Sequence, residues 1–104
     1  MLNRISHSFP SDHPAANGHF PGNPIIPGAV LLNDVVDTIG AAEHALPMSY
    51  EVSAAKFLRP VRPGNNVTIT WEKRASGEIR FECLLAPDDQ AALTGVLKLI
   101  GGQA

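Results

Sequence analysis

Three prolines and three glycines are interspersed over residues 18–28, immediately before a stretch with a helical pattern. Each proline ring fixes φ near about −65°, whereas the glycines at positions 18, 22 and 28 leave the backbone free to turn between them. We therefore expect a stiff, folded-back loop rather than a flexible one. Such a loop would hold His19 at a fixed distance from the first amides of the following helix, and a reactive side chain needs a rigid mount of this kind.

The composition indicates one globular domain over residues 1–104, with 44% hydrophobic and 17% charged residues. The formal net charge of −2 leaves no basic excess for phosphates, which argues against nucleic acid as a partner. No run approaches the ~18 apolar residues of a membrane span, so no membrane partner is expected. The first residues carry no apolar signal segment, and the single cysteine, Cys83, fits a reducing cytoplasm and core packing.

Apolar residues recur at steps of three and four in residues 28–45, which predicts a helix with a broad apolar face. Pro47 is expected to end this helix. A short strand is expected at residues 5–9, and a period of two predicts further strands at 52–58, 67–71, 79–85 and 92–100. Because short turns separate these later strands, they should pair antiparallel.

These elements predict an α+β fold in which a meander of strands curls around one long helix. A single sheet around a single helix leaves one side poorly covered in a chain of 104 residues. We therefore expect dimerisation through the sheet edge and the proline-rich loop, which would place that loop at a subunit boundary.

His19 can act as a general base near neutral pH, and the alternative is a structural histidine bonded to a loop carbonyl. The amide of Gly28 and those just after it lack partners within the helix, so they could stabilise a carbonyl oxygen that gains negative charge. Alternatively, Pro27 is only a favourable first-turn residue and Gly28 a packing requirement. No cysteine or carboxylate spacing accompanies the histidines, so neither a metal nor another cofactor is expected.

Residues 19–28 read HFPGNPIIPG and residues 56–64 read KFLRPVRPG. These segments resemble the active-site loop, and the strand and turn after the central helix, of the bacterial 3-hydroxyacyl-(acyl carrier protein) dehydratases of the FabA/FabZ group. With Gly95 in the last strand, the resemblance extends from Asp12 to Leu99. It implies the hot-dog fold, an antiparallel sheet wrapped around one long central helix.

The resemblance also implies roles for individual residues. His19 would act on the α-carbon proton of a thioester-linked 3-hydroxyacyl chain, and the Gly28 amide would polarise the thioester carbonyl. An acidic residue of the helix, contributed by the other subunit, donates a proton to the leaving hydroxyl in this family, and Asn33 occupies its position. The other residues expected to contact the substrate are Phe20, Pro21, Gly22, Ile26 and Pro27.

Asn33 departs from the family pattern, because an amide cannot release a proton as a carboxylic acid does. Asp34 is rotated by ~100° around the helix, and Asp37 lies on the same face as Asn33 but ~6 Å further along the axis. We therefore keep three readings: a dehydratase with weakened activity, a heterodimer with an acid-bearing relative, and a non-catalytic acyl-binding subunit. A hot-dog acyl thioesterase is a fourth.

The substrate implied by the resemblance is tethered to an acyl carrier protein or to coenzyme A, within fatty acid or related acyl biosynthesis. Carrier proteins are usually acidic, which gives Arg59 and Arg62 a docking role through screened electrostatic attraction. Their alternative role is to cap the turn before Pro63 and Gly64.

Overall fold

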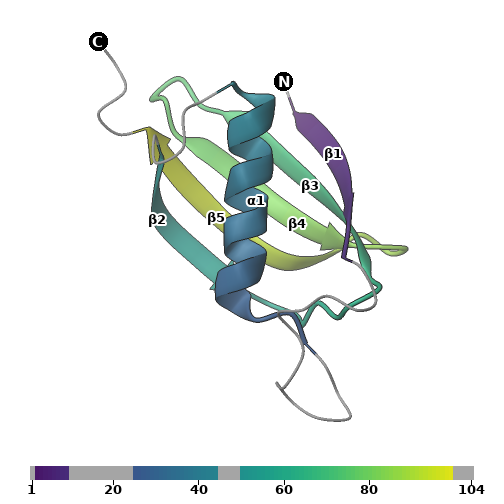
Figure 1. The fold of residues 1–104 in the computed structure, drawn as a ribbon. Coiled ribbons are helices and arrows are strands. Elements are labelled where there is room, and N and C mark those ends of the chain that lie inside the picture. The colour runs from purple at the N-terminus through teal and green to yellow at the C-terminus, as the bar shows by residue number, and fades with distance from the viewer. Residues whose placement is uncertain (1, 10–24, 45–49, 100–104) are drawn as a thin grey trace.

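The computed structural model describes residues 2–9, 25–44 and 50–99 (Figure 1). Within these ranges the chain forms one helix and five strands. In chain order they are β1 (Asn3–Ser8), α1 (Gly28–Ala42), β2 (Tyr50–Phe57), β3 (Asn66–Lys73), β4 (Ile79–Leu85) and β5 (Gln90–Leu99). No helix of these described ranges is long and apolar enough to cross a membrane.

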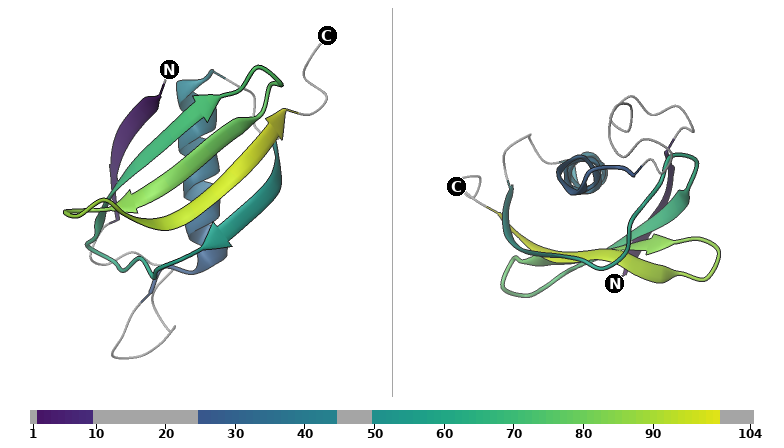
Figure 2. Two further views of the ribbon diagram at one scale, coloured as in Figure 1. Left: turned by 180° about the vertical axis from the view of Figure 1, so that it is seen from behind. Right: turned by 90° about the horizontal axis from the view of Figure 1, so that it is seen from below.

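The five strands form one antiparallel sheet in the order β1-β3-β4-β5-β2. β3, β4 and β5 form a meander, but the strand expected at 52–58 is not part of it, because β2 pairs with β5 and not with its chain neighbour β3. β1 and β2 form the two edges of the sheet. The sheet curves around α1, which lies in its concave side (Figure 2, right). This arrangement confirms the predicted α+β hot-dog fold.

The core lies between α1 and the inner face of the sheet. Leu31, Val35 and Ile39 form the buried stripe of the helix, as the apolar spacing predicts. Because side chains alternate along a strand, every second residue of the sheet faces this stripe. The fully buried inner-face residues are Ile69, Cys83, Leu93 and Leu97, and Trp71, Ile79 and Phe81 are 2% exposed. Cys83 is therefore a core residue, and burial raises the pKa of its thiol to about 11.

The helix ends at Ala42, three residues before its predicted end at residue 45. His44 adopts a positive φ of 55°, the left-handed conformation that commonly follows the last helical turn. Its amide donates a hydrogen bond to the carbonyl of Ala41 at 3.2 Å. Pro47, the predicted stop, lies outside the described residues.

The strand at Ile79–Leu85 has its predicted bounds, and the others differ at their ends. The strand expected at residues 5–9 runs from Asn3 to Ser8, and the one expected at 67–71 runs from Asn66 to Lys73. The ladder between them is the reason, since it continues past the apolar residues to the pairs Asn3–Trp71 and Ser8–Asn66. β2 begins and ends earlier than the predicted 52–58, and β5 begins before residue 92.

Candidate active site

A cavity of about 420 Å³ lies at the first turn of α1, beside the chain segment that follows β2. Its wall is mostly apolar, and Arg59 is the one charged residue among the described residues that line it. The lining residues are Ile25, Ile26, Gly28, Leu31, Phe57, Leu58, Arg59, Pro60 and Val61. The cavity therefore combines a helix N-terminus with an apolar wall, as a site for an acyl chain with one polar end would.

The first amides of α1 have no partner within the helix, and Gly28, which carries the first of them, lines the cavity. The first bond of the α1 ladder runs from the Leu31 amide to the Pro27 carbonyl at 3.0 Å, so the amides of residues 28–30 precede the ladder. Pro27 occupies the cap position without a side-chain hydrogen bond. The positive end of the helix dipole adds to these amides, and together they favour an oxygen with negative charge.

Gly28 is held closely against the ring of Phe57. A Cβ atom added at Gly28 would lie 3.1 Å from Cε1 of Phe57, closer than side chains normally pack. Ile26, which is 2% exposed, fixes the same turn through a 2.7 Å hydrogen bond from its amide to the Val61 carbonyl. A larger residue at this position would therefore require the Phe57 ring to shift by a few tenths of an ångström.

The two candidate docking arginines occupy different surroundings. Arg59 lines the cavity, and its Nη1 donates a 2.7 Å hydrogen bond to the Ala91 carbonyl, which fixes the guanidinium at the cavity wall. Arg62 is exposed and does not line the cavity. Its amide donates to Oδ1 of Asn65 at 2.8 Å within the turn. The structure thus brings only Arg59 to the candidate site.

Asn33 lies on the face of α1 that points away from the sheet, and it is exposed. Asp37, one turn further on, is exposed on the same face, whereas Asp34 is partly buried. Asn33 is five residues beyond Gly28, so the two are about 7.5 Å apart along the helix axis. It does not line the cavity of this chain, and a partner that covers the exposed face of α1 would meet it.

His19, Phe20, Pro21 and Gly22 lie outside the described residues, so the predicted base and its loop have no observed position. Ile26, Pro27 and Gly28 are described and come together at the start of α1. Within the described ranges, no three of the histidine, cysteine, aspartate and glutamate side chains are grouped so that they could hold a metal ion.

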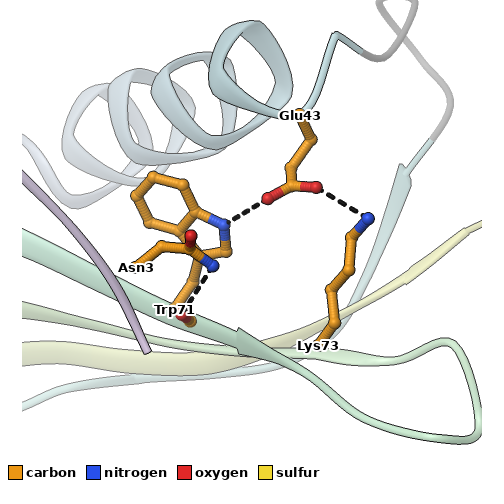
Figure 3. Close-up of polar contacts among 4 residues, drawn as sticks. All are labelled: Asn3, Glu43, Trp71 and Lys73. Atoms are coloured by element: carbon orange, nitrogen blue, oxygen red, sulfur yellow. Dashed lines mark hydrogen bonds and ion pairs between the residues drawn. The ribbon is translucent and has the colours of Figure 1, made fainter. Parts of the chain in front are cut away.

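Sequence reasoning missed a polar cluster at the other end of α1 (Figure 3). The Glu43 carboxylate accepts a 2.8 Å hydrogen bond from Nε1 of Trp71 and forms a 2.7 Å ion pair with Nζ of Lys73. These two donors, Lys73 first and Trp71 second, lower the pKa of Glu43 below its ordinary value. The sequence did contain a signal for this cluster, namely an acidic residue at the end of the predicted helix. A carboxylate at the negative end of a helix dipole needs hydrogen-bond donors or a cation to offset the repulsion.

A larger hollow, of about 600 Å³, lies on the outer face of the sheet, away from α1. Arg80, Thr94 and other strand residues line it, and none of the predicted site residues that the structure describes does. We assign the candidate active site to the smaller cavity, since it alone contains the helix N-terminus.

The family model described as "ApeI-like: ApeI dehydratase" matches residues 3–96, nearly the whole chain. The chain belongs to the ApeI-like dehydratase family. The matched residues of this ApeI-like chain include all described residues that line the cavity and both recognised sequence segments.

Two relatives of this ApeI-like chain are 3-hydroxyacyl-[acyl-carrier-protein] dehydratases named FabZ. The chain is 32% identical to the FabZ of Ligilactobacillus salivarius over 95 residues, which are 83% of this chain and 68% of that protein. It is 30% identical to the FabZ of Ralstonia nicotianae over 93 residues, 78% of this chain. The match spans only 57% of that relative's length.

Among solved structures, the ApeI-like chain is similar to the dehydratase heterocomplex ApeI:P from Xenorhabdus doucetiae. The TM-score is 0.74 and the identity 26%, with 94% of this chain and 86% of that chain covered. The recognised dehydratase resemblance and the fold are thereby confirmed.

Proposed function

We propose that this chain is a 3-hydroxyacyl thioester dehydratase that removes water to give a 2-enoyl thioester. The observation that carries the proposal is the apolar cavity at the start of α1, into which the helix presents amides that precede its hydrogen-bond ladder. Family membership and the FabZ relatives support the same reaction class. The acyl chain would lie against Ile26, Leu31 and Phe57.

The reaction needs a base, a site for negative charge and a proton for the leaving oxygen. His19 removes the proton from the α-carbon, and the electron pair moves toward the thioester carbonyl. The amide of Gly28 and the helix dipole stabilise the oxygen of the resulting enolate. The electron pair then returns to form the double bond between the α- and β-carbons, while the bond from the β-carbon to the hydroxyl oxygen breaks. That oxygen leaves as water once it takes up a proton.

Asn33 limits the last step. Its amide can orient the leaving hydroxyl or a water molecule, but it supplies no acidic proton. Loss of one partner of an acid and base pair costs ~10²- to 10⁴-fold in rate, so we expect slow turnover. Asn33 faces away from its own sheet, which is where a second subunit would approach.

A second candidate is a heterodimer in which an acid-bearing relative completes the site built from His19 and Gly28. The observation that favours it is the similarity to a dehydratase that was solved as a heterocomplex. In this arrangement the relative's carboxyl group would occupy the position that Asn33 leaves without an acid. The chain would then act as the subunit that supplies the base and binds the acyl group.

The thioester would be carried by an acyl carrier protein or by coenzyme A. Arg59, fixed at the cavity wall by its bond to the Ala91 carbonyl, is placed to meet a phosphate or an acidic carrier surface. We expect Arg59→Glu to raise KM for a carrier-protein substrate at low salt. Arg62→Glu is the matched control, because Arg62 lies outside the cavity wall.

The test is dehydration of a short 3-hydroxyacyl carrier-protein thioester by the wild type, His19→Ala and Asn33→Asp. We expect His19→Ala to lose at least ~10²-fold in rate and Asn33→Asp to gain at least ~10-fold. Asp37→Asn is the matched control, because it removes a carboxyl group from the same exposed face one turn away.

A rate that neither His19→Ala nor Asn33→Asp changes would contradict the proposal. Release of free acid instead of the enoyl thioester would replace it with a thioesterase. If the wild type turns over only when a carboxylate-bearing relative is added, the heterodimer is the active form.

A further inference from the structure

The end of β1 is bonded to the segment between β2 and β3. Phe9 follows β1 directly, and its amide donates a 3.1 Å hydrogen bond to the Asn65 carbonyl. Its carbonyl accepts a 2.8 Å bond from the Gly64 amide. Phe9 is also part of the buried core, so packing holds it as well as bonding. The point at which the chain leaves β1 is therefore set by the backbone at Gly64 and Asn65.

The entry to α1 is bonded to the same segment. The Val61 carbonyl accepts the 2.7 Å bond from the Ile26 amide, and both residues belong to the core. Ile26 lies two positions before Gly28, the first residue of the helix. Phe9 and Ile26 are 17 positions apart in the sequence, yet their bonding partners lie within four residues of each other, a span of at most ~14 Å. One short segment thus holds both ends of the stretch that contains His19.

The part of this segment between the two anchors is a tight turn with two closing bonds. The Asn65 amide donates a 3.0 Å hydrogen bond to the Arg62 carbonyl, which closes a four-residue turn at residues 62–65. Pro63 and Gly64 occupy its central positions, and Gly64 has a φ of 89°, as a type II turn requires there. Oδ1 of Asn65 accepts a second bond, 2.8 Å long, from the Arg62 amide. The backbone and the side chain of Asn65 therefore both tie the end of the turn to its start.

Asn65 also connects the turn to β1, because its carbonyl accepts the bond from the Phe9 amide. The turn lies between Val61, which holds the entry to α1, and the two groups that hold Phe9. A change that opens the turn would therefore move these anchors relative to each other. It would alter the separation between Phe9 and Ile26.

We propose that Asn65 is a positioning residue for the dehydration reaction. By closing the turn it sets the separation between the exit from β1 and the entry to α1, and with it the place of His19 relative to the Gly28 amide. This role rests on the proposed function, in which His19 is the base. Asn65 does not line the cavity, so it acts through the backbone that it holds. A displacement of about 1 Å at a reacting group can cost ~10²-fold in rate.

The test compares Asn65→Ala, which removes the acceptor for the Arg62 amide, with Asn65→Asp, which keeps one. With a short 3-hydroxyacyl carrier-protein substrate, we expect Asn65→Ala to lower kcat ~10- to 10²-fold and to leave KM within about 2-fold. KM should hold because the cavity wall at Leu31 and Phe57 lies outside the turn. Asn65→Asp should keep at least about half of the wild-type kcat, since its carboxylate can accept the same bond.

Asn66→Ala is the matched control. Asn66 is the next residue and also an asparagine, but its Oδ1 accepts a 2.8 Å bond from the Ser8 hydroxyl and takes no part in closing the turn. We expect Asn66→Ala to have the wild-type kcat. If Asn65→Asp or Asn66→Ala lost as much activity as Asn65→Ala, the positioning role of the Asn65 side chain would be wrong.

A double-variant comparison separates positioning from loss of stability. If Asn65 acts through His19, Asn65→Ala should cost nothing further in a His19→Ala chain, because the positioned group is already gone. A loss caused by partial unfolding would instead appear in both backgrounds. Equal fold-losses of kcat in the two backgrounds would therefore overturn the proposal.

Amide exchange measured by NMR tests the anchor without any need for activity. We expect the amides of Phe9 and Gly64 to exchange at least ~10-fold faster in Asn65→Ala and at nearly the wild-type rate in Asn65→Asp. The Leu31 amide, which is bonded to the Pro27 carbonyl, is the internal reference. Unchanged exchange at Phe9 and Gly64 in Asn65→Ala would show that the side chain does not hold the anchor, against the proposal.

The failure of this proposal can be told from the failure of the proposed function. A rate that His19→Ala does not lower would overturn the proposed function and the positioning role together. A rate that His19→Ala lowers and Asn65→Ala leaves unchanged would overturn the positioning role alone.

Discussion

Glu43 shows how a single side chain can offset an unfavourable position. A carboxylate at a helix C-terminus opposes the helix dipole, which costs about 0.3–1 kcal/mol. Here the side chain is only 15% exposed and accepts donors from Trp71 and Lys73, both on β3. Figure 3 shows these contacts together with the bond from Nδ2 of Asn3 to the Trp71 carbonyl, which links β1 to the same place.

We expect the stability supplied by Glu43 to depend on pH. Its pKa is lower in the folded chain than in the unfolded one. The contribution is therefore fully present above the ordinary carboxyl pKa of about 4.3, and it is lost as pH falls from there through the lowered folded value. Glu43→Gln should remove this loss of stability at low pH. At pH 7 it should lower the free energy of unfolding by only about 0.5–1 kcal/mol, since Lys73 is largely exposed and Trp71 keeps a hydrogen-bond acceptor.

The measurement is urea unfolding between pH 3 and pH 7, followed by the fluorescence of Trp71, the only tryptophan of the chain. Glu82→Gln is the matched control, because Glu82 is exposed on the outer face of the sheet. Identical pH profiles for the wild type and Glu43→Gln would show that this contact contributes nothing in solution.

At the scale of elements, β2 and β5 approach each other closely at Gly95. An added Cβ there would overlap the ring of Phe81 and would lie 2.5 Å from the Ala54 carbonyl oxygen. The second of these atoms belongs to the backbone of β2, so it cannot move without moving the strand. Gly95 therefore fixes how near β2 lies to the rest of the sheet.

Gly95→Ala should destabilise the fold by about 1–3 kcal/mol, because an overpacked site forces backbone shifts. Gly40→Ala is the contrasting variant. Gly40 lies within α1, and an added Cβ would have no neighbour within 4 Å, so we expect a gain of about 0.8–1 kcal/mol. Chemical unfolding of both variants provides the check, and a neutral Gly95→Ala would mean that β2 sits further from β5.

The sequence predicted the helix and the strands better than the contacts between them. The apolar spacing predicted the stripe of Leu31, Val35 and Ile39, and alternation predicted the strands of the meander, because both patterns are local. The contact between Glu43 and Trp71 joins residues 28 positions apart and depends on the strand register, which no local pattern encodes. The position of the Arg59 side chain at the cavity wall likewise depends on its bond to the distant Ala91 carbonyl.

Part of the candidate site could likewise be predicted from the sequence, and part could not. The start of the helix at Gly28 and the adjoining turn were predictable, since proline and glycine act on their own backbone. The cavity itself was not, because its walls come from the start of α1 with the residues just before it and from the end of β2 with the segment that follows, which are about 30 residues apart in the sequence. Asn33 was recognised from the sequence alone as a departure from the family pattern, and the structure adds that its side chain is exposed.

Over the whole molecule, the order of the strands in the sheet separates local pairings from distant ones. β3, β4 and β5 are joined by short turns, whereas β1 pairs with β3 and β2 with β5 across long stretches of chain. Closing a long loop costs conformational entropy before its contacts form. The central strands can therefore assemble first, and both edges join a sheet that already exists.

This order of assembly predicts how well the backbone hydrogen bonds of each strand are protected in the folded chain. Amide hydrogens of β3 to β5 should exchange slowest with solvent deuterium, and those of β1 and β2 fastest. If the chain dimerises through one of its sheet edges, raising the protein concentration should slow exchange in that edge strand and leave the other edge unchanged. Exchange measured by mass spectrometry at two concentrations would make this comparison within one molecule, with the unpaired edge as its internal reference. The dimer would then protect a strand that the monomer holds only loosely.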